Sequence, residues 1–579
     1  MEASRLREIL NRSVVFRVIF TAVSFFQHEP WKQARRLMDS SLFFRAIDAV
    51  FAFFQRISAV SLTAKLFTGQ ISEGAYRSSV FVRLVQNFFQ FFVNMRRTWF
   101  KTAYDNSGWS YVMDSLGALA QGSFFARVLS RFLGVELSRP RKLSWFPVIL
   151  LVIGLAASAA ALCVFSPFYA AAGIAGIVGA LCVLAYPEWG VIAITAAAPF
   201  LPTMILAAML GLTTLCYFIK LLTDAAYAPF IDPTGLMVIV FIIVGLFYGV
   251  TSFDPSGSIK VALLTSLIML GYLLVTALIN SRRKLNTLLF VFCASAAVTG
   301  LIGAYQKLSG KVDMTYVDKE LFSDIGLRIP STFANPNVYG AYLLLAIPVC
   351  MIMIHMSNRI AFKLYYLLIT ALLLYNLVFT YSRGCYLALG AGLIVYILFM
   401  ERRLIALFIP GLAVLPFVMP ASVIKRVLSI SDLSDSSSSY RIYIWQATLR
   451  ILKDFWISGL GQGIGAYNVV YPYYAFNDVT APHSHNLFLQ VFVELGIFGL
   501  IVFLVLLLTF FRTMLRLYGR TRNKKTKAFL AGFIAAASAF LLQGMFDYVF
   551  YNYRVMLTFF VFMGIGCAMV NVRLKEDFC

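Results

Sequence analysis

Long, uninterrupted apolar runs recur along the chain from Trp145 onward. Many reach the roughly 18–20 residues that an α-helix needs to cross a bilayer. A transmembrane β-barrel would show alternating strands of about ten residues instead. The pattern therefore predicts an all-α, polytopic helical membrane protein with about 12–14 transmembrane helices in residues 145–579. The expected spans are residues 146–165, 168–186, 188–200, 202–222, 235–251, 259–279, 286–306, 337–356, 362–380, 385–400, 404–419, 485–511, 527–545 and 555–571.

Residues 1–144 are rich in phenylalanine but lack a clean spanning run. In the stretch 83–97, arginine and amide side chains fall on one helical stripe, and phenylalanines fill the opposite face. A basic amphipathic helix of this kind lies in the membrane interface. The region holds 20 Lys/Arg and 9 Asp/Glu, a net charge of +11. We expect a cytoplasmic, membrane-associated region that contacts anionic lipids; the alternative is a soluble helical domain with a phenylalanine core.

Composition supports the membrane assignment. The chain is 60% hydrophobic and only 13% charged, whereas ordinary globular chains carry about 25% charged residues. The net charge of +23 would suggest nucleic acid in a soluble protein. In a membrane protein it indicates basic cytoplasmic loops, so no nucleic-acid partner is expected. The eight cysteines match neither a disulfide framework nor a metal site.

Basic loops also predict the orientation. The basic clusters fall on one side once the spans alternate: residues 281–284, 358–363, 401–403, 520–527 and 573–575. This predicts cytoplasmic N- and C-termini in the cytoplasmic membrane. The segments 307–336 and 420–484 then face outward, and the second is too long for a plain connector.

Three arginines face outward near the membrane in this topology, against the usual bias: Arg328, Arg383 and Arg441. Ser438 or Ser439 can cap a helix and place Arg441 in its first turn. A positive charge there opposes the helix dipole, and a bound anion would resolve the conflict. Each arginine can instead be a snorkelling or carboxylate-paired side chain. Together they favour a phosphate-bearing substrate.

Two of the four histidines, His483 and His485, stand one residue apart where the apolar run 485–511 begins. A metal site needs three or four ligands, and the other two histidines are expected on the cytoplasmic side, so no metal is expected. A hydrogen-bonded imidazole at a helix start is the structural alternative. An unperturbed imidazole has a pKa near 6.5 and accepts a proton at neutral pH, which favours a general base.

Four glycines alternate in "SGLGQGIGAYN": residues 459, 461, 463 and 465. Their spacing does not match a dinucleotide-binding fingerprint, and no βαβ unit surrounds them. They predict a flexible loop after a helix. The tyrosines that follow are able to stack on sugar rings.

The stretch "HNLFLQVFVELGIFGL" resembles the signature of the O-antigen ligase and O-antigen polymerase family of membrane glycosyltransferases. That signature is a histidine, then Asn, Ser or Gln, nine residues and Gly-x-x-Gly. The match runs from His485 through Asn486 to Gly496 and Gly499, and a start at His483 fails the spacing. "STFANPNVYGAYL", "TYSRGCYLALGAG" and "YRIYIWQATLRILKDFWISGLGQGIGAYN" also resemble family blocks, so the similar core covers about residues 328–508.

The resemblance implies a fold similar to the GT-C class of glycosyltransferases and transfer of a glycan from undecaprenyl diphosphate to an acceptor hydroxyl. The reaction would take place at the outer face of a bacterial cytoplasmic (inner) membrane, without a metal or other cofactor. The resemblance assigns the catalytic histidine to His485 and the diphosphate-binding arginines to Arg383 and Arg441. Arg328 is a weaker match, and His483 and Asn486 are secondary candidates.

Two further functions stay open from the sequence. A flippase for lipid-linked oligosaccharide would carry ionisable residues near the midplane, and Glu494 is nearly the only deep acid. It is expected on the helix face opposite His485. Ligases, polymerases and protein O-oligosaccharyltransferases share the motifs, so the acceptor is a glycan, a lipid or a protein hydroxyl. The large N-terminal region favours a polymerase of a surface polysaccharide.

Overall fold

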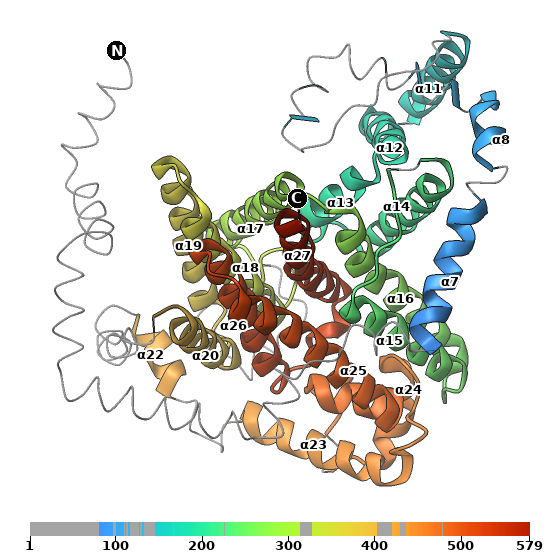
Figure 1. Ribbon diagram of the computed structural model, residues 1–579. Helices are drawn as coiled ribbons and strands as arrows, with labels where there is room; N and C mark the ends of the chain where they lie inside the picture. The colour runs from blue at the N-terminus through green and yellow to red at the C-terminus, as the bar shows by residue number, and fades with distance from the viewer. Residues whose placement is uncertain are drawn as a thin grey trace, which may run out of the picture. The chain divides into compact units, whose positions relative to one another are not determined.

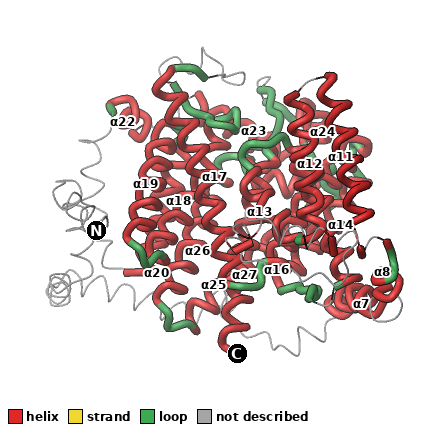
Figure 2. The backbone as a smooth tube through the Cα atoms, turned by 90° about the horizontal axis from the view of Figure 1, so that it is seen from above, coloured by secondary structure: helices red, strands yellow, loops and turns green. Residues whose placement is uncertain are grey.

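The computed structural model describes residues 80–95, 100–108, 145–165, 167–224, 226–312, 327–401, 420–428, 436–476 and 479–578, with a few single positions between 110 and 131. Within these residues the chain forms helices and no β-strand (Figure 2). The described helices belong to one compact unit, residues 71–400 and 414–579. The predicted all-α, polytopic fold is confirmed.

The described helices follow one another in this order: α7 (Val80–Met95), α8 (Lys101–Asp105), α11 (Trp145–Phe165), α12 (Pro167–Ala185), α13 (Pro187–Ala197), α14 (Thr203–Thr223), α15 (Pro233–Val250), α16 (Pro255–Leu278), α17 (Arg282–Ser309), α18 (Pro336–Met356), α19 (Ile360–Phe379), α20 (Arg383–Glu401), α22 (Ala421–Leu428), α23 (Ser436–Phe455), α24 (Ile464–Val470), η4 (Tyr471–Tyr473), α25 (Leu487–Arg520), α26 (Lys524–Gly544), η5 (Val549–Tyr551) and α27 (Tyr553–Phe578).

Ten of these helices, α14–α20 and α25–α27, are long and apolar enough to cross a membrane. Helices α11 and α12 form where spans were expected, and the expected span 404–419 lies outside the described residues. The expected span 188–200 is wrong. Helix α13 has 11 residues, about 16 Å of helix, which is half the hydrocarbon thickness.

Although α13 is short, the chain after α14 lies at the same end of the bundle that the spans predict. Glu188, at the start of α13, accepts hydrogen bonds from Tyr227, which follows α14, and from Lys284, near the start of α17, at 3.0 and 2.8 Å. Helices α13 and α14 therefore form a hairpin that begins and ends at one end of the bundle. The alternation of the later spans is unchanged.

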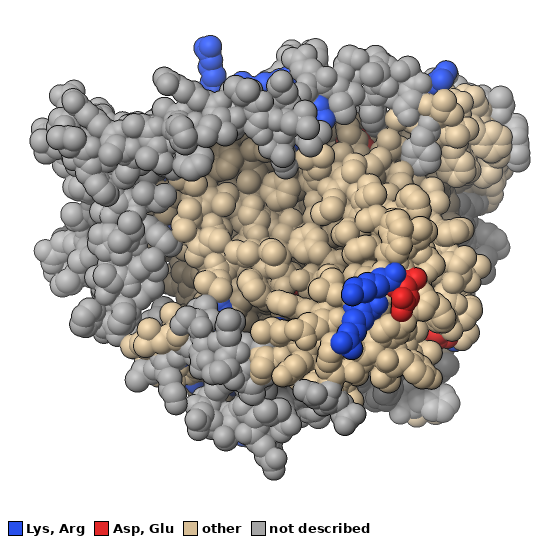
Figure 3. All heavy atoms as spheres, turned by 90° about the horizontal axis from the view of Figure 1, so that it is seen from below, with Lys and Arg blue, Asp and Glu red and all other residues tan. Residues whose placement is uncertain are grey.

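Helices α18, α26 and α27 form the centre of the bundle (Figure 1). In their spanning windows 83%, 78% and 89% of residues are buried, against 33% for α19 and 22% for α20. Helices α19 and α20 are therefore less enclosed and lie nearer the periphery of the bundle, where lipid is the expected solvent. Figure 3 shows one side of the bundle as a broad band of uncharged side chains, as a lipid-facing surface requires.

The bundle has two chemically different ends. At the first, which we call the basic end, α17 and α26 begin and α18 finishes; there Lys525 Nζ donates to the carbonyl of Met356 at 3.0 Å. At the second, the site end, α18, α20, α25 and α27 begin. Asn486 there donates to the carbonyl of Met545 at 2.9 Å, which joins the start of α25 to the end of α26.

Helix α7 confirms the helix expected around residues 83–97, and it packs on the side of α14. Phe89 and Phe92 contact Phe218, one turn before α14 finishes at the basic end. Phe88 and Phe91 stay more than half exposed. Membrane association of the N-terminal region remains a prediction, and these outward phenylalanines fit it.

Helix α25 is interrupted at Gly496, where φ is 57° and ψ is −171°. The interruption is joined to the segment after α23 by backbone hydrogen bonds. Leu460 N–H donates to the Val493 carbonyl at 2.8 Å, and Ile497 N–H donates to the Trp456 carbonyl, also at 2.8 Å. Backbone groups that leave the helical pattern therefore find partners in the neighbouring segment, as a dry environment demands. We call this junction the backbone clasp.

The alternating glycines serve this junction. Gly459 has φ +58°, and a Cβ atom there would lie 2.6 Å from the Glu494 carbonyl oxygen. The next glycine, Gly461, donates its N–H to that same carbonyl at 3.0 Å. The predicted flexible loop is instead a bonded segment in which glycine is needed for close approach.

The clasp divides α25 into two functional parts. Residues 497–520 measure about 36 Å as a helix, enough to cross a membrane alone. Residues 487–495 therefore belong to the site end. There Val493 packs in a separate apolar cluster with residues of α23 and α24. This piece of α25 at the site end follows directly after the two histidines.

The orientation predicts a labelling pattern in intact cells. A cysteine in place of Tyr473, which is 86% exposed at the site end, should react with a membrane-impermeant thiol reagent. A cysteine at the exposed Arg522 of the basic end should react only after the membrane is opened. Both are made with Cys163, the exposed native thiol among the described residues, replaced by serine. The reverse labelling pattern would contradict the orientation.

Candidate active site

His485 lies in a tight turn immediately before α25. Its φ is +49°, a left-handed conformation that few residues other than glycine adopt and that usually marks a constrained position. Asn486 follows as the N-cap, and its side chain accepts from the N–H groups of Phe488 and Leu489. The cap fixes the direction of the helix, and the turn directs the His485 ring back towards α26 and α27.

Asp547 meets that ring. His485 Nδ1 lies 3.2 Å from Asp547 Oδ1, and the two side chains are 24% and 5% exposed. Burial raises the pKa of Asp547, but the hydrogen bond and charge of His485, with Arg441 and His483, outweigh burial and hold it well below its usual value. An ionised Asp547 accepts a hydrogen bond from Nδ1–H, so the neutral imidazole has its lone pair on Nε2.

His483 supports the turn from within. Its Nδ1 accepts the backbone N–H of His485 at 3.3 Å, and its ring stacks on Tyr551 with centroids 5.0 Å apart. Burial, followed by the charges of His485 and Arg441, lowers the pKa of His483 to about 3. His483 is therefore neutral at physiological pH, and the buried ring acts as a fixed acceptor.

A second polar group gathers on the turn between α19 and α20. Arg328 Nε donates to the Thr380 carbonyl at 2.9 Å, and Arg426 Nε donates to the next carbonyl, that of Tyr381, at 3.3 Å. Arg383 begins α20 two residues further on. Three arginines thus share one turn at the site end.

Arg441 belongs to the histidine group. Its charge contributes to lowering the pKa values of both Asp547 and His483, and Tyr440 places its ring 6.4 Å from the His485 ring. Burial, together with the charges of Arg426 and Arg441, also lowers the pKa of Arg328, to about 10. The two groups of basic side chains are therefore neighbours.

One local expectation for Arg441 is wrong. Helix α23 begins at Ser436, so Ser438 and Ser439 lie inside it and Arg441 is beyond its first turn. The serine run 436–439 forms the first turn of the helix and does not cap it. An anion near Arg441 would therefore meet its guanidinium and not the free N–H groups of the helix start.

The cluster also has the spacing of a cation site. Ligand atoms of His483, His485 and Asp547 all lie within 4.8 Å of one another. The charge of Arg441 opposes a cation at this point. A cation would also have to replace the contact between His485 and Asp547. Proton transfer to His485 needs no such replacement.

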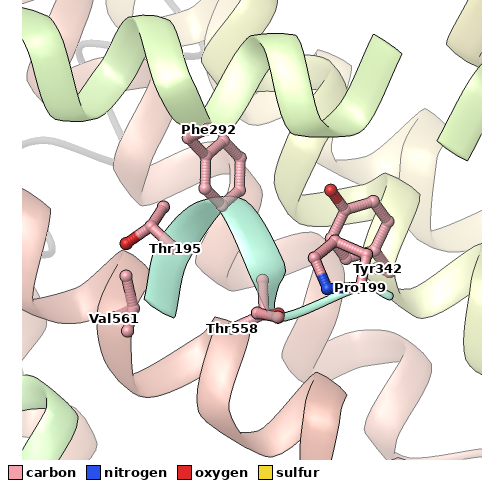
Figure 4. Close-up of a pocket in the computed structure, with 7 residues that line it drawn as sticks. Thr195, Pro199, Phe292, Tyr342, Thr558 and Val561 are labelled. Carbon is pink, nitrogen blue, oxygen red and sulfur yellow. The ribbon is translucent and has the colours of Figure 1, made fainter. Parts of the chain in front are cut away.

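A separate small pocket lies deeper in the bundle, between α13, α17, α18 and α27 (Figure 4). Its lining has hydroxyl groups but neither carboxylates nor imidazoles, so it offers no acid or base for catalysis. The residues that line it are Thr195, Ala198, Pro199, Phe292, Tyr342, Thr558 and Val561.

Comparison with known proteins gives a match that includes this part of the chain. Residues 368–504 match the family described as O-antigen ligase. This segment of the chain is similar to the O-antigen ligase family. The match includes Arg383, Arg441 and both histidines of the turn. The chain is also 23% identical over 359 residues to the teichuronic acid biosynthesis protein TuaE of Bacillus subtilis. That alignment covers 58% of this chain and 72% of TuaE.

The sequence did not reveal Asp547 or Arg426. Asp547 follows the matched segment by more than forty positions, and no motif surrounds it. Its signal was topological, since a single acid between the spans 527–545 and 555–571 must lie at the same end as His485. Arg426 stood in a polar outer segment, where a basic side chain has many possible partners.

The lowered pKa of His483 predicts acid sensitivity. The folded protein keeps His483 neutral, whereas the unfolded chain protonates it below about pH 6.5. The free energy of unfolding is therefore not reduced by this group above that pH, and it decreases as the pH falls toward 3. Each pH unit in this window costs about 1.4 kcal/mol from this group. We expect His483→Asn to flatten the decline of melting temperature between pH 7 and 5 in detergent. An unchanged slope would show that His483 is not held neutral.

Proposed function

We propose that the protein transfers a glycan from undecaprenyl diphosphate to an acceptor hydroxyl at the outer face of the cytoplasmic membrane. The observation that carries the proposal is the contact between His485 and Asp547 at the end of the bundle where Arg328, Arg383, Arg426 and Arg441 gather. The match of residues 368–504 to the O-antigen ligase family supports glycan assembly as the process. A base and several guanidiniums are the groups that this reaction needs.

The bond changes follow from the donor. The acceptor oxygen attacks the anomeric carbon, and the bond from that carbon to the diphosphate oxygen breaks. The acceptor proton passes to Nε2 of His485, while Asp547 stabilises the resulting imidazolium through Nδ1–H. Undecaprenyl diphosphate leaves with the bonding electron pair.

The arginines act on the leaving group. Negative charge grows on the diphosphate as the bond breaks. One guanidinium can donate two parallel hydrogen bonds to a pair of phosphate oxygens. Arg383 and Arg441 hold the diphosphate. Arg328 and Arg426 donate hydrogen bonds to the turn that precedes Arg383. Arg328 is 7% exposed and bonded to Asn337 at 2.8 Å, so it orients the turn as well as adding positive potential.

Among acceptors, we favour another lipid-linked glycan, which makes the enzyme a polymerase of a surface polysaccharide. The relative named for teichuronic acid biosynthesis supports polysaccharide formation. Transfer to a lipid, as in a ligase, or to a protein hydroxyl uses the same groups. A flippase would move the donor without releasing undecaprenyl diphosphate, so measuring that release separates an enzyme from a transporter.

The proposal predicts different defects for the base and the arginines. His485→Ala should lower turnover by about 10²–10⁴ with donor affinity nearly unchanged, because the imidazole acts on the acceptor. Arg383→Ala and Arg441→Ala should weaken donor binding, and lysine should rescue poorly because it lacks the planar fork. Donor binding and single-turnover transfer, measured on the same preparations, check both.

Two outcomes would contradict these roles. If His485→Ala transfers at the wild-type rate, another group takes the proton. If His485→Ala loses donor binding as severely as the arginine variants, the imidazole sits on the diphosphate instead. Arg522→Ala at the exposed basic end is the matched arginine control.

Metal independence is part of the proposal. Dialysis against a chelator should leave transfer unchanged, since Arg441 and its neighbours supply the positive charge that a cation would. The check is turnover before and after chelation, with Mg²⁺ or Mn²⁺ added back. Loss with chelator and recovery with metal would assign His483, His485 and Asp547 to a metal site.

A further inference from the structure

A buried hydrogen-bond chain lies directly beneath the histidine turn. The backbone N–H of Ser484, between the two histidines, donates to Gln490 Oε1 at 2.7 Å. The other end of that amide, Gln490 Nε2, donates to Glu494 Oε1 at 2.9 Å. Ser484 and Gln490 are fully buried, and Glu494 is 5% exposed. The Gln490 side chain therefore connects the Glu494 carboxyl to the backbone of the histidine turn.

The chain has one chemically allowed direction. The backbone N–H of Ser484 can only donate, so the amide must present its oxygen to Ser484 and its NH₂ group to Glu494. Gln490 thereby fixes the backbone of the turn, and Glu494 holds the other end of the amide. Glu494 was expected on the face opposite His485; the intervening amide connects the two.

The turn requires this support because its backbone is constrained. His485 has φ +49°, and Ser484 Oγ donates to the Asn486 carbonyl at 3.0 Å. If Gln490 released the Ser484 N–H, a buried donor would lose its partner and the turn would rearrange to satisfy it. Such a rearrangement would move the His485 ring, which must reach both Asp547 and an acceptor hydroxyl.

The clasp fixes the acid end of the chain. The Glu494 carbonyl accepts from Gly461 N–H at 3.0 Å, so the backbone of Glu494 is tied to the segment after α23. The same segment is continuous with the helix that carries Arg441. The acid therefore has a fixed position relative to both halves of the site.

We propose that Gln490 and Glu494 are positioning residues that hold the histidine turn, and with it His485, in the geometry for proton transfer. This inference rests on the proposed function, in which His485 is the base. Neither residue touches the reacting atoms. Their effect is on turnover and not on donor binding.

The first test breaks the chain at its centre. Gln490→Met removes both hydrogen bonds with little change in volume. Turnover should fall about 10- to 100-fold, the scale of a small misplacement of a catalytic group, while the KM for the lipid-linked donor stays the same. Thr448→Val is the matched control: it loses a buried hydrogen bond to Tyr467, 2.9 Å long, in the apolar cluster of the site end. It should keep wild-type turnover.

The second test reverses the chain. Gln490→Glu alone places two carboxylates against each other, so turnover should fall at alkaline pH, where the two groups no longer share a proton. Adding Glu494→Gln restores a donor, because the carboxylate now at position 490 accepts both from the Ser484 N–H and from the new amide at position 494. The double variant should therefore recover most of the turnover lost by Gln490→Glu. A purely structural role for these positions would instead make turnover follow the folded fraction, measured by size-exclusion chromatography.

The outcomes separate this inference from the proposed function. Wild-type turnover of Gln490→Glu at alkaline pH, or no recovery in a folded double variant, overturns the positioning role. If His485→Ala in the same membranes is inactive in that case, the base assignment stands and only the positioning role fails. If His485→Ala is fully active, the proposed function itself fails. The reversal remains decisive even where Gln490→Met does not fold.

Discussion

The backbone clasp at Gly496 is the constraint on which the arrangement of the site end depends. A membrane-spanning helix that is interrupted exposes carbonyl and N–H groups that lipid cannot satisfy. Here the carbonyls of Val493 and Glu494 accept from the segment 459–461, and Ile497 donates to the Trp456 carbonyl just before it. The interruption thereby joins the segment after α23 to the bundle. It also separates a lipid-crossing piece of α25 from a piece that carries the histidine turn.

Electrostatics explains why the site end suits an anionic donor. Four arginines and one ionised aspartate gather where His483 stays neutral, so positive charge dominates. Neighbouring guanidiniums repel one another, and a diphosphate would relieve that repulsion. The basic end shows the usual solution instead, with Lys284 paired to Glu188 at 2.8 Å. The difference between the ends is consistent with substrate binding at one and anchoring at the other.

Apolar run length was enough to predict the all-α membrane fold, because bilayer thickness fixes helix length. It failed at α13, where a half-length helix was taken for a span, since composition does not record where a chain turns back. The resemblance placed His485, Arg383 and Arg441, and the structure brings them to one end. The sequence did not reveal Asp547 and Arg426, because their roles depend on contacts across 62 and 45 positions of the chain. Gln490 lies within the quoted motif, but its hydrogen bond to Ser484 depends on the left-handed turn at His485, which residue spacing does not show.

Asp547→Asn tests the central claim, that an aspartate-oriented imidazole is the base at this end of the molecule. An amide there is nearly the same size but can present NH₂ to Nδ1, which places the histidine proton on the wrong nitrogen. Single-turnover transfer should fall by about 10²–10⁴, with donor binding retained and the folded fraction unchanged. Transfer at the wild-type rate in this variant would contradict the claim.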